Sequence, residues 1–173
     1  MGKSASGKDH IYARLAAHEG LGLKKLVLYT TRPIRAEEEN GKQYYFVDDK
    51  KLEEFRSSGN LIEARAYHTV HGIWNYFTAD DGQVDLENAD YLGIGTLESY
   101  VKMREYYGKE NVCPVYIEVE DGERLARALK RERGQEIPPA MRKLCRRFLA
   151  DHGGFFRRKS CCCRDYEKIP ECD

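Results

Sequence analysis

The chain has 173 residues, of which 41% are apolar, and its 29 basic and 29 acidic side chains leave a formal net charge of zero. This composition excludes low-complexity disorder, collagen and coiled coil, and it predicts a single globular domain over residues 1–173. No stretch approaches the ~20 apolar residues of a membrane span. The N-terminus also lacks the apolar region of a signal peptide, so we expect a cytoplasmic protein that binds no membrane.

Basic residues are concentrated toward the C-terminus, where residues 124–159 contain twelve Lys and Arg against three Asp and Glu. Such a segment either binds anions or forms a solvated basic helix face. Aromatic residues do not interleave with the charges in the manner of a nucleic-acid-binding module, so nucleic acid is not an expected partner. A clamp for phosphate groups is the more specific interpretation.

Hydrophobic periodicity and turn residues predict alternating helices and strands in the first half of the chain. The elements are a helix after the glycine-rich opening with Ile11 and Leu15 on its apolar side, a strand at 26–29, a strand at 44–47 after the turn at Asn40-Gly41, a helix at 52–57 capped by Asp48 or Asp49 and ended by Gly59, and strands at 61–63 and 72–78. Residues 30–78 therefore indicate a small α+β insert. Pro33 ends the first strand, and functional side chains often lie at such strand ends.

The second half continues the alternation. The elements predicted there are a short apolar run at 91–95, a helix that Thr96 caps and Gly108 ends, a strand at 112–119, a helix at 122–133, a break at Pro138-Pro139 and a helix at 140–150. This order is typical of an α/β fold with a mostly parallel sheet and helices on its faces. In such folds ligands bind beyond the carboxyl ends of the strands.

The N-terminus carries a phosphate-binding motif, because Gly2-Lys3-Ser4-Ala5-Ser6-Gly7-Lys8 matches G-x-x-x-x-G-K. In this motif backbone N–H groups bind phosphate oxygens and the lysine neutralises their charge. Asp9 stands where the pattern has the Ser or Thr that contacts Mg²⁺. A buried strand should lead into the loop, and only Met1 precedes Gly2, so we expect the first strand to be missing from this chain.

A second motif follows, formed by Thr30-Thr31-Arg32-Pro33-Ile34-Arg35, Glu37-Glu38-Glu39-Asn40-Gly41 and Tyr44-Tyr45-Phe46-Val47. It resembles the nucleoside-monophosphate segment of guanylate kinases, and the resemblance covers roughly residues 1 to 150. It implies a parallel sheet of the P-loop NTPase type flanked by helices, with a small α+β lobe that binds the monophosphate and a helical lid. The implied boundaries are 1–29 and 79–173 for the core, 30–78 for the lobe, and the vicinity of 127–147 for the lid.

The resemblance also implies an activity, the Mg²⁺-dependent transfer of the γ-phosphoryl group of ATP to GMP, with ATP and GMP as binding partners. Residues Gly2 to Asp9 would bind ATP, with Lys8 on the donor phosphates. The lid arginines Arg127, Arg131 and Arg147 would converge on the transferring phosphate. No oligomeric state is predicted.

The implied GMP-binding residues are Arg32, Arg35, Tyr44, Glu63, Tyr76 and Thr78. Arginine forks and a tyrosine hydroxyl suit an acceptor phosphate. Glu63 would accept hydrogen bonds from guanine N1–H and the 2-amino group, which adenine does not offer.

Each of these residues also has a structural interpretation. Arg32 and Arg35 would form a solvated ion-pair network with the neighbouring glutamates, Tyr44 would pack in a strand, and Glu63 would be a surface residue.

Several positions depart from the family pattern. Gly93-Ile94-Gly95 replaces a D-x-D segment whose carboxylates organise Mg²⁺, and Leu28 replaces a serine that faces the base. The register of residues 72–78 places either Asn75 or Tyr76 at the phosphate-binding tyrosine. These departures favour a second hypothesis, a nucleotide- or partner-binding module of this family that has lost turnover.

Two groups of metal-ligand residue types lack the spacing of a metal site. His68 and His71 have no third ligand nearby in the sequence, and Cys161, Cys162 and Cys163 are adjacent. Adjacent thiols cannot easily surround one tetrahedral ion. We therefore predict no protein-bound structural metal.

Overall fold

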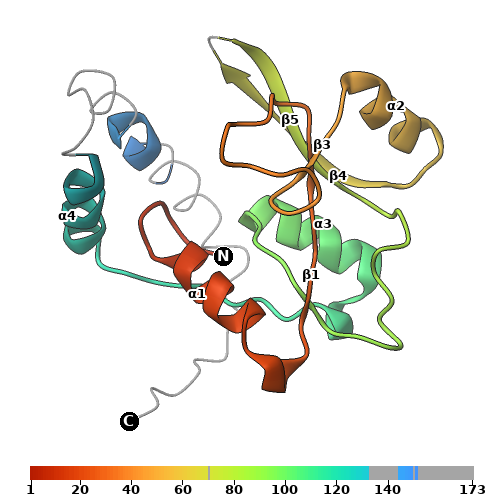
Figure 1. The fold of residues 1–173 in the computed structure, drawn as a ribbon, viewed down its shortest axis with the longest axis horizontal. Coiled ribbons are helices and arrows are strands. Elements are labelled where there is room, and N and C mark those ends of the chain that lie inside the picture. The colour runs from red at the N-terminus through yellow and green to blue at the C-terminus, as the bar shows by residue number, and fades with distance from the viewer. Residues whose placement is uncertain (70, 133–143, 150, 152–173) are drawn as a thin grey trace. The chain divides into compact units, whose positions relative to one another are not determined.

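The computed structural model describes residues 1–69, 71–132, 144–149 and 151 (Figure 1). Two compact units are present. The acceptor unit comprises Met1 and Lys8–Tyr116, and the loop unit comprises Gly2–Gly7 and the residues from Ile117 onward.

The main sheet of the acceptor unit has four strands in the order β3-β2-β5-β4. The strands are β2 (Tyr29–Thr30), β3 (Tyr45–Phe46), β4 (Leu61–Thr69) and β5 (Gly72–Ala79). β2 pairs parallel with β3, whereas β5 pairs antiparallel with both β2 and β4. The long hairpin of β4 and β5 therefore supplies most of this sheet.

A second sheet pairs β1 (Lys24–Lys25) parallel with β6 (Tyr91–Leu92). The backbone between β1 and β2 is not in a regular strand, although Leu26 and Leu28 are buried there. Of the predicted strand at 26–29, only Tyr29 lies in a strand, because β1 ends at Lys25 and β2 begins at Tyr29, in a different sheet. The parallel pairing that the sequence predicts is present in both sheets, but the hairpin makes the larger sheet mixed.

Three α-helices belong to the acceptor unit: α1 (Lys8–Ala16), α2 (Asp49–Ser57) and α3 (Leu97–Tyr107). Short 3₁₀ helices, η1 (Glu19–Leu21) and η2 (Lys109–Asn111), follow α1 and α3. Both α2 and α3 contact β4 (Figure 1). Thr96 caps α3, with the Thr96 side chain and Ser99 hydroxyl each bonding the backbone of the other, and Gly108 ends the helix as predicted.

The hydrophobic core of the acceptor unit lies between α2 and one face of the main sheet. It contains Tyr29, Leu52, Phe55, Phe77 and Ala79. The rings of Tyr29 and Phe77 stack at 5.1 Å, and Phe55 meets Tyr29 edge to face. Because side chains alternate along a strand, burial of Phe77 and Ala79 directs Tyr76 and Thr78 to the opposite face.

Helix α2 begins at Asp49, directly after its N-cap residue Asp48. Of the two aspartates expected as caps, Asp48 is the N-cap, and its carboxylate accepts the backbone N–H of Lys51 at 2.9 Å. We expect Asp48→Ala to lower the free energy of unfolding by about 1 kcal/mol, measured by urea denaturation. Lys50→Ala, an exposed change in the first turn, is the matched control and should have little effect. Equal losses in the two variants would contradict the capping role.

The loop unit contains α4 (Asp121–Glu132), close to the helix predicted at 122–133, and residues 144–149 are also helical. The strand predicted at 112–119 is not regular. Ile117 alone in that segment pairs with another strand-like residue, in a parallel bridge with Gly2. The break at Pro138-Pro139 and part of the last predicted helix lie outside the described residues.

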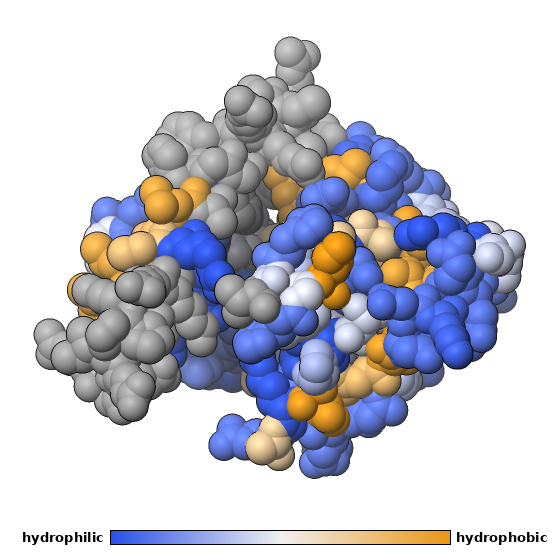
Figure 2. Space-filling view, turned by 90° about the horizontal axis from the view of Figure 1, so that it is seen from above, coloured by the Kyte–Doolittle hydropathy of each residue, from blue (hydrophilic) through white to orange (hydrophobic). Residues whose placement is uncertain are grey.

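No helix in the described ranges is both long and apolar enough to cross a membrane. In the view of Figure 2, apolar surface appears as separate patches within a largely hydrophilic surface.

Candidate functional site

Three of the predicted acceptor residues, Glu63, Tyr76 and Thr78, lie with Arg65 on the face of the main sheet that is opposite the core. In the β4–β5 register Glu63 is opposite Thr78, and Arg65 is opposite Tyr76. Residues two apart on a strand share a face, so Glu63 and Arg65 point the same way. The sheet thereby presents a carboxylate, a guanidinium and two hydroxyl groups on one surface.

Arg32 follows β2 and is only 4% exposed. Its Nη1 and Nη2 donate to the two carboxylate oxygens of Glu38 at 2.7 and 2.5 Å, which forms a forked ion pair. Its Nε donates to Tyr76 Oη at 3.0 Å, and Nη1 also donates to Pro33 O at 2.9 Å. Forked pairs restrict orientation as well as position, so the guanidinium is held in one arrangement.

Aromatic rings surround this guanidinium. Its central carbon lies 5.5 Å from the ring centroid of Tyr44 and 5.1 Å from that of Phe46. Tyr44 also meets Tyr76 edge to face at 5.5 Å, and its half-buried position raises the pKa of its phenol above the ordinary value, chiefly through desolvation. The structure therefore brings Arg32, Tyr44 and Tyr76 together.

Arg35 is exposed, and its backbone N–H donates to Glu38 Oε2 at 3.0 Å. The hydrogen bonds from Arg32 hold the pKa of Glu38 down to about 2, well below its usual range, with a smaller contribution from the Arg35 N–H. Arg32 and Glu38 thus form an ion pair, but a buried one and not the solvated network considered from the sequence. The Arg35 side chain remains accessible beside this pair.

Glu63 is the centre of a second polar group. Thr78 Oγ1 donates to Glu63 Oε1 at 2.8 Å. Arg65 donates from Nη2 to Oε1 at 3.1 Å and from Nε to Oε2 at 2.9 Å, and its Nη1 reaches Thr96 Oγ1 at 3.2 Å. Glu63 is therefore not the surface residue of the structural interpretation, because only 2% of its side chain is exposed.

The register of β5 distinguishes between Asn75 and Tyr76. Tyr76 lies on the Arg32 side, whereas Asn75 Nδ2 donates to Asp49 at the start of α2 at 3.1 Å. Tyr76 is consequently the tyrosine that shares a face with Arg32 and Glu63.

A cleft of about 520 Å³ adjoins Tyr44, a size within the range of small-molecule sites. Its lining includes Asp9 and Tyr12 of α1, Lys25 of β1, and Leu28. Leu28, which takes the place of the expected serine, thus contributes an apolar wall to this cleft.

The backbone of the predicted phosphate loop turns tightly. Ala5 and Gly7 have positive φ angles of 61° and 86°. The Ser6 hydroxyl is buried and has no hydrogen-bond partner within the described residues. An unpaired buried hydroxyl is costly, so this atom is suited to a ligand that supplies the missing partner.

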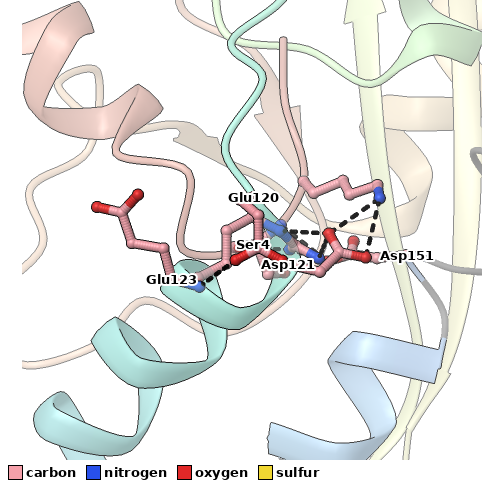
Figure 3. Close-up of polar contacts among 7 residues, drawn as sticks. Ser4, Glu120, Asp121, Glu123 and Asp151 are labelled. Carbon is pink, nitrogen blue, oxygen red and sulfur yellow. Dashed lines mark hydrogen bonds and ion pairs between the residues drawn. The ribbon is translucent and has the colours of Figure 1, made fainter.

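Arg124 joins the loop to α4 and to Asp151. Ser4, Asp121 and Asp151 lie close together in Figure 3. The Arg124 side chain is 2% exposed and donates to Ser4 O at 2.6 Å, to Asp121 Oδ1 at 2.8 Å and to Asp151 Oδ2 at 3.2 Å. Phe148 lies under the guanidinium at 4.7 Å. The Asp151 carboxylate also accepts the Ser4 N–H at 2.9 Å, so this loop N–H is already paired within the protein.

The remaining residues predicted for the loop and the lid lie on different elements. Lys3 pairs with Asp121 at 3.2 Å, and Lys8 is the first residue of α1, followed by the exposed Asp9. On α4, Arg127 pairs with Glu123 and has Nη1 3.8 Å from where a Cβ on Gly7 would lie. Arg131 and Arg147 are both exposed, on α4 and on segment 144–149.

No group of three or more His, Cys, Asp or Glu side chains that would hold a metal is found within the ranges that the structure describes. His71 stacks on Trp74 at 6.2 Å. The adjacent cysteines lie outside those ranges.

Sequence reasoning missed the roles of Arg65, Arg124 and Asp151. The i, i+2 spacing of Arg65 from Glu63 on a predicted strand is a signal that would have found the first pair. The i, i+3 spacing of Asp121 and Arg124 on a helix would have indicated the second. Asp151 is distant from the loop in sequence, and no local pattern connects them.

Comparisons with known proteins agree with this architecture. The crystal structure of guanylate kinase from Anaplasma phagocytophilum is similar, with a TM-score of 0.51 and 26% identity over 76% of this chain and 64% of that chain. A glycine-rich phosphate loop joined to mixed α/β sheets and helices places the fold in the class of α/β P-loop kinases.

The sequence comparisons find guanylate kinases as well. The guanylate kinase family model matches residues 1–74. The guanylate kinase of Wolbachia pipientis wMel is 37% identical over 40% of this chain, and that of Anaplasma phagocytophilum (strain HZ) is 29% identical over 73% of it. These alignments span 35% and 59% of the two relatives' own lengths. Over the matched stretches, the chain is similar to guanylate kinases.

Proposed function

We propose that this chain is a nucleoside-monophosphate kinase that transfers the γ-phosphoryl group of ATP to GMP, yielding ADP and GDP. The observation that carries the proposal is the grouping of Arg32, Tyr44 and Tyr76 on the same sheet face as Glu63 and Thr78. Phosphoryl transfer depends on positioning two nucleotides and on neutralising charge. This face offers both a cationic grip and a polar group for a base.

On the acceptor side, the exposed guanidinium of Arg35 and the hydroxyl of Tyr44 would bind the GMP phosphate, together with the Tyr76 hydroxyl. Arg32 is already paired with Glu38, so its part is to hold Tyr76 and supply positive potential. Glu63 and Thr78 would contact the guanine. A phosphate oxygen of GMP attacks the γ-phosphorus, and the bond to the ADP leaving oxygen breaks.

On the donor side, the loop N–H groups, the unpaired Ser6 hydroxyl and Lys8 would bind ATP phosphates. Arg127, near Gly7, would bind the transferring phosphoryl group, and Arg131 and Arg147 would assist. Mg²⁺, when bound with ATP, supplies charge neutralisation on the phosphates. The exposed Asp9 carboxylate at the start of α1 is the hard oxygen ligand that suits it.

The proposal is tested by ADP release with ATP and Mg²⁺ in the presence of GMP, dGMP, AMP or UMP in turn. Of these four acceptors, we expect only GMP and dGMP to support release. In that assay Arg35→Ala should lower kcat/KM roughly 100-fold or more, because the acceptor phosphate loses its accessible guanidinium. Arg56→Ala, a change at an exposed arginine of α2 paired with Glu53, is the control. Unchanged kinetics in Arg35→Ala would remove Arg35 from the site.

A second candidate function is nucleotide binding without turnover. It is favoured by the segment Gly93-Ile94-Gly95, which has no carboxylate side chains where the family pattern has two that organise Mg²⁺. Titration calorimetry that records GMP binding to a chain that releases no ADP would support this module and exclude the kinase.

A further inference from the structure

Arg65 occupies the groups of Glu63 that a guanine would use. Its guanidinium forks onto both carboxylate oxygens, at 2.9 and 3.1 Å, and 10% of its side chain is exposed. Its Nη1 is anchored by Thr96, which the cap of α3 holds in place. Arg65 is thus fixed from two sides.

The hydrogen-bond capacity of Glu63 is limited. An ionised carboxylate has about four lone-pair sites, two on each oxygen. Oε1 already accepts from Thr78 and Arg65, and Oε2 already accepts from Arg65. One site is left, and it is on Oε2.

Guanine presents two adjacent donors, N1–H and the 2-amino group, and reading both requires an open site on each carboxylate oxygen. Hypoxanthine keeps N1–H and lacks the amino group. With Arg65 in place Glu63 accepts one of these donors, so the amino group that distinguishes the two bases gains no partner on Oε1.

We propose that Arg65 is a specificity-determining residue that reduces the preference of this chain for GMP over IMP by occupying Glu63. The inference rests on the proposed function, in which Glu63 contacts the base. While Arg65 contacts both oxygens of Glu63, this carboxylate can still accept a hydrogen bond from N1–H. GMP and IMP both carry that N1–H group. Removal of the guanidinium would expose both oxygens to the 2-amino group and N1–H of guanine.

The test compares dissociation constants of GMP and IMP by titration calorimetry at pH 8. For the unmodified chain we expect the two constants to agree within roughly threefold, since the additional donor of guanine is unpaired. In Arg65→Met the preference for GMP should rise roughly tenfold or more, because a hydrogen bond to a charged group is regained. Arg65→Lys, which cannot fork, should give an intermediate ratio.

Arg56→Met on α2 is the matched control and should leave the ratio unchanged. Circular dichroism establishes whether each variant is folded; if Arg65→Met is not, the unmodified chain and Arg65→Lys decide. A strong preference for GMP in the unmodified chain, or the same ratio with and without Arg65, overturns the inference while leaving GMP binding intact. Failure of the unmodified chain to bind either nucleotide overturns the proposed function and this inference with it.

Discussion

Replacing Arg32 with methionine is expected to lower the free energy of unfolding by about 3 kcal/mol. The change removes both hydrogen bonds to Glu38, whose side chain is 15% exposed, and it removes the donor to Tyr76. Breaking one partner of a buried pair leaves a desolvated charge, and the residual exposure of Glu38 places the loss at the lower end of the usual range. Urea denaturation monitored by circular dichroism measures the effect.

The control is Arg56→Met, which breaks an exposed pair with Glu53 and should change stability by less than about 0.5 kcal/mol. The double variant Arg32→Met/Glu38→Met should recover most of the loss, since no unpaired carboxylate remains. Simple additivity of the two changes would show that the pair does not act as a unit.

The same pair makes stability depend on pH in a defined direction. Because Arg32 holds the folded-state pKa of Glu38 at about 2, below its ordinary value, the pair stabilises the fold fully above the ordinary carboxyl pKa. That contribution is lost as pH falls from about 5 toward 2. Glu38→Gln should therefore flatten this part of the acid-unfolding curve relative to the unmodified chain.

Replacing Arg124 with methionine is expected to loosen residues 2–7 and, under the proposed function, to weaken the binding of ATP. The change removes the donor to Ser4 O and leaves Asp151, 14% exposed, without its cationic partner. We expect a stability loss of about 3 kcal/mol, again from an uncompensated buried carboxylate. Calorimetric titration with ATP and Mg²⁺ measures the loss of binding.

A local readout distinguishes loop disruption from general unfolding. Amide hydrogen exchange of residues 2–7 should accelerate in Arg124→Met more than exchange in β4 and β5. Lys130→Met, at an exposed position of the same helix, is the matched control and should retain both protection and ATP binding. Unchanged protection of the Ser4 N–H in Arg124→Met would contradict the role given to Arg124.

Sequence reasoning located most elements in the described residues because their signals are local. Helix α3, its Thr96 cap and the Gly108 end, helix α2 and strand β5 lie close to where periodicity, capping and turn chemistry place them. The same reasoning failed for residues 112–119. An apolar run rich in β-branched residues shows only that the segment could form a strand. A regular strand also needs a neighbouring strand that pairs with it along its length.

The motifs in the sequence pointed to the candidate site. In the structure, contacts across neighbouring strands join Arg32, Tyr44 and Tyr76 in one group and Glu63 and Thr78 in another. The sequence did not show which partners the side chains of those residues would contact. Whether Arg32 binds Glu38 or solvent, and whether Glu63 is open or held by Arg65, depends on which side chains share a desolvated surface.

The sequence by itself determined the phosphate loop, the order of most elements and the residue types suited to a nucleotide. Only the tertiary structure decided that Tyr76 rather than Asn75 faces Arg32, that Arg65 occupies Glu63, and that Arg124 joins the loop to Asp151. The physical reason is the distance along the sequence between the residues that interact. Backbone preferences and caps are set by residues a few positions apart, whereas strand register and buried charge pairing are set by contacts between segments that the chain brings together only on folding.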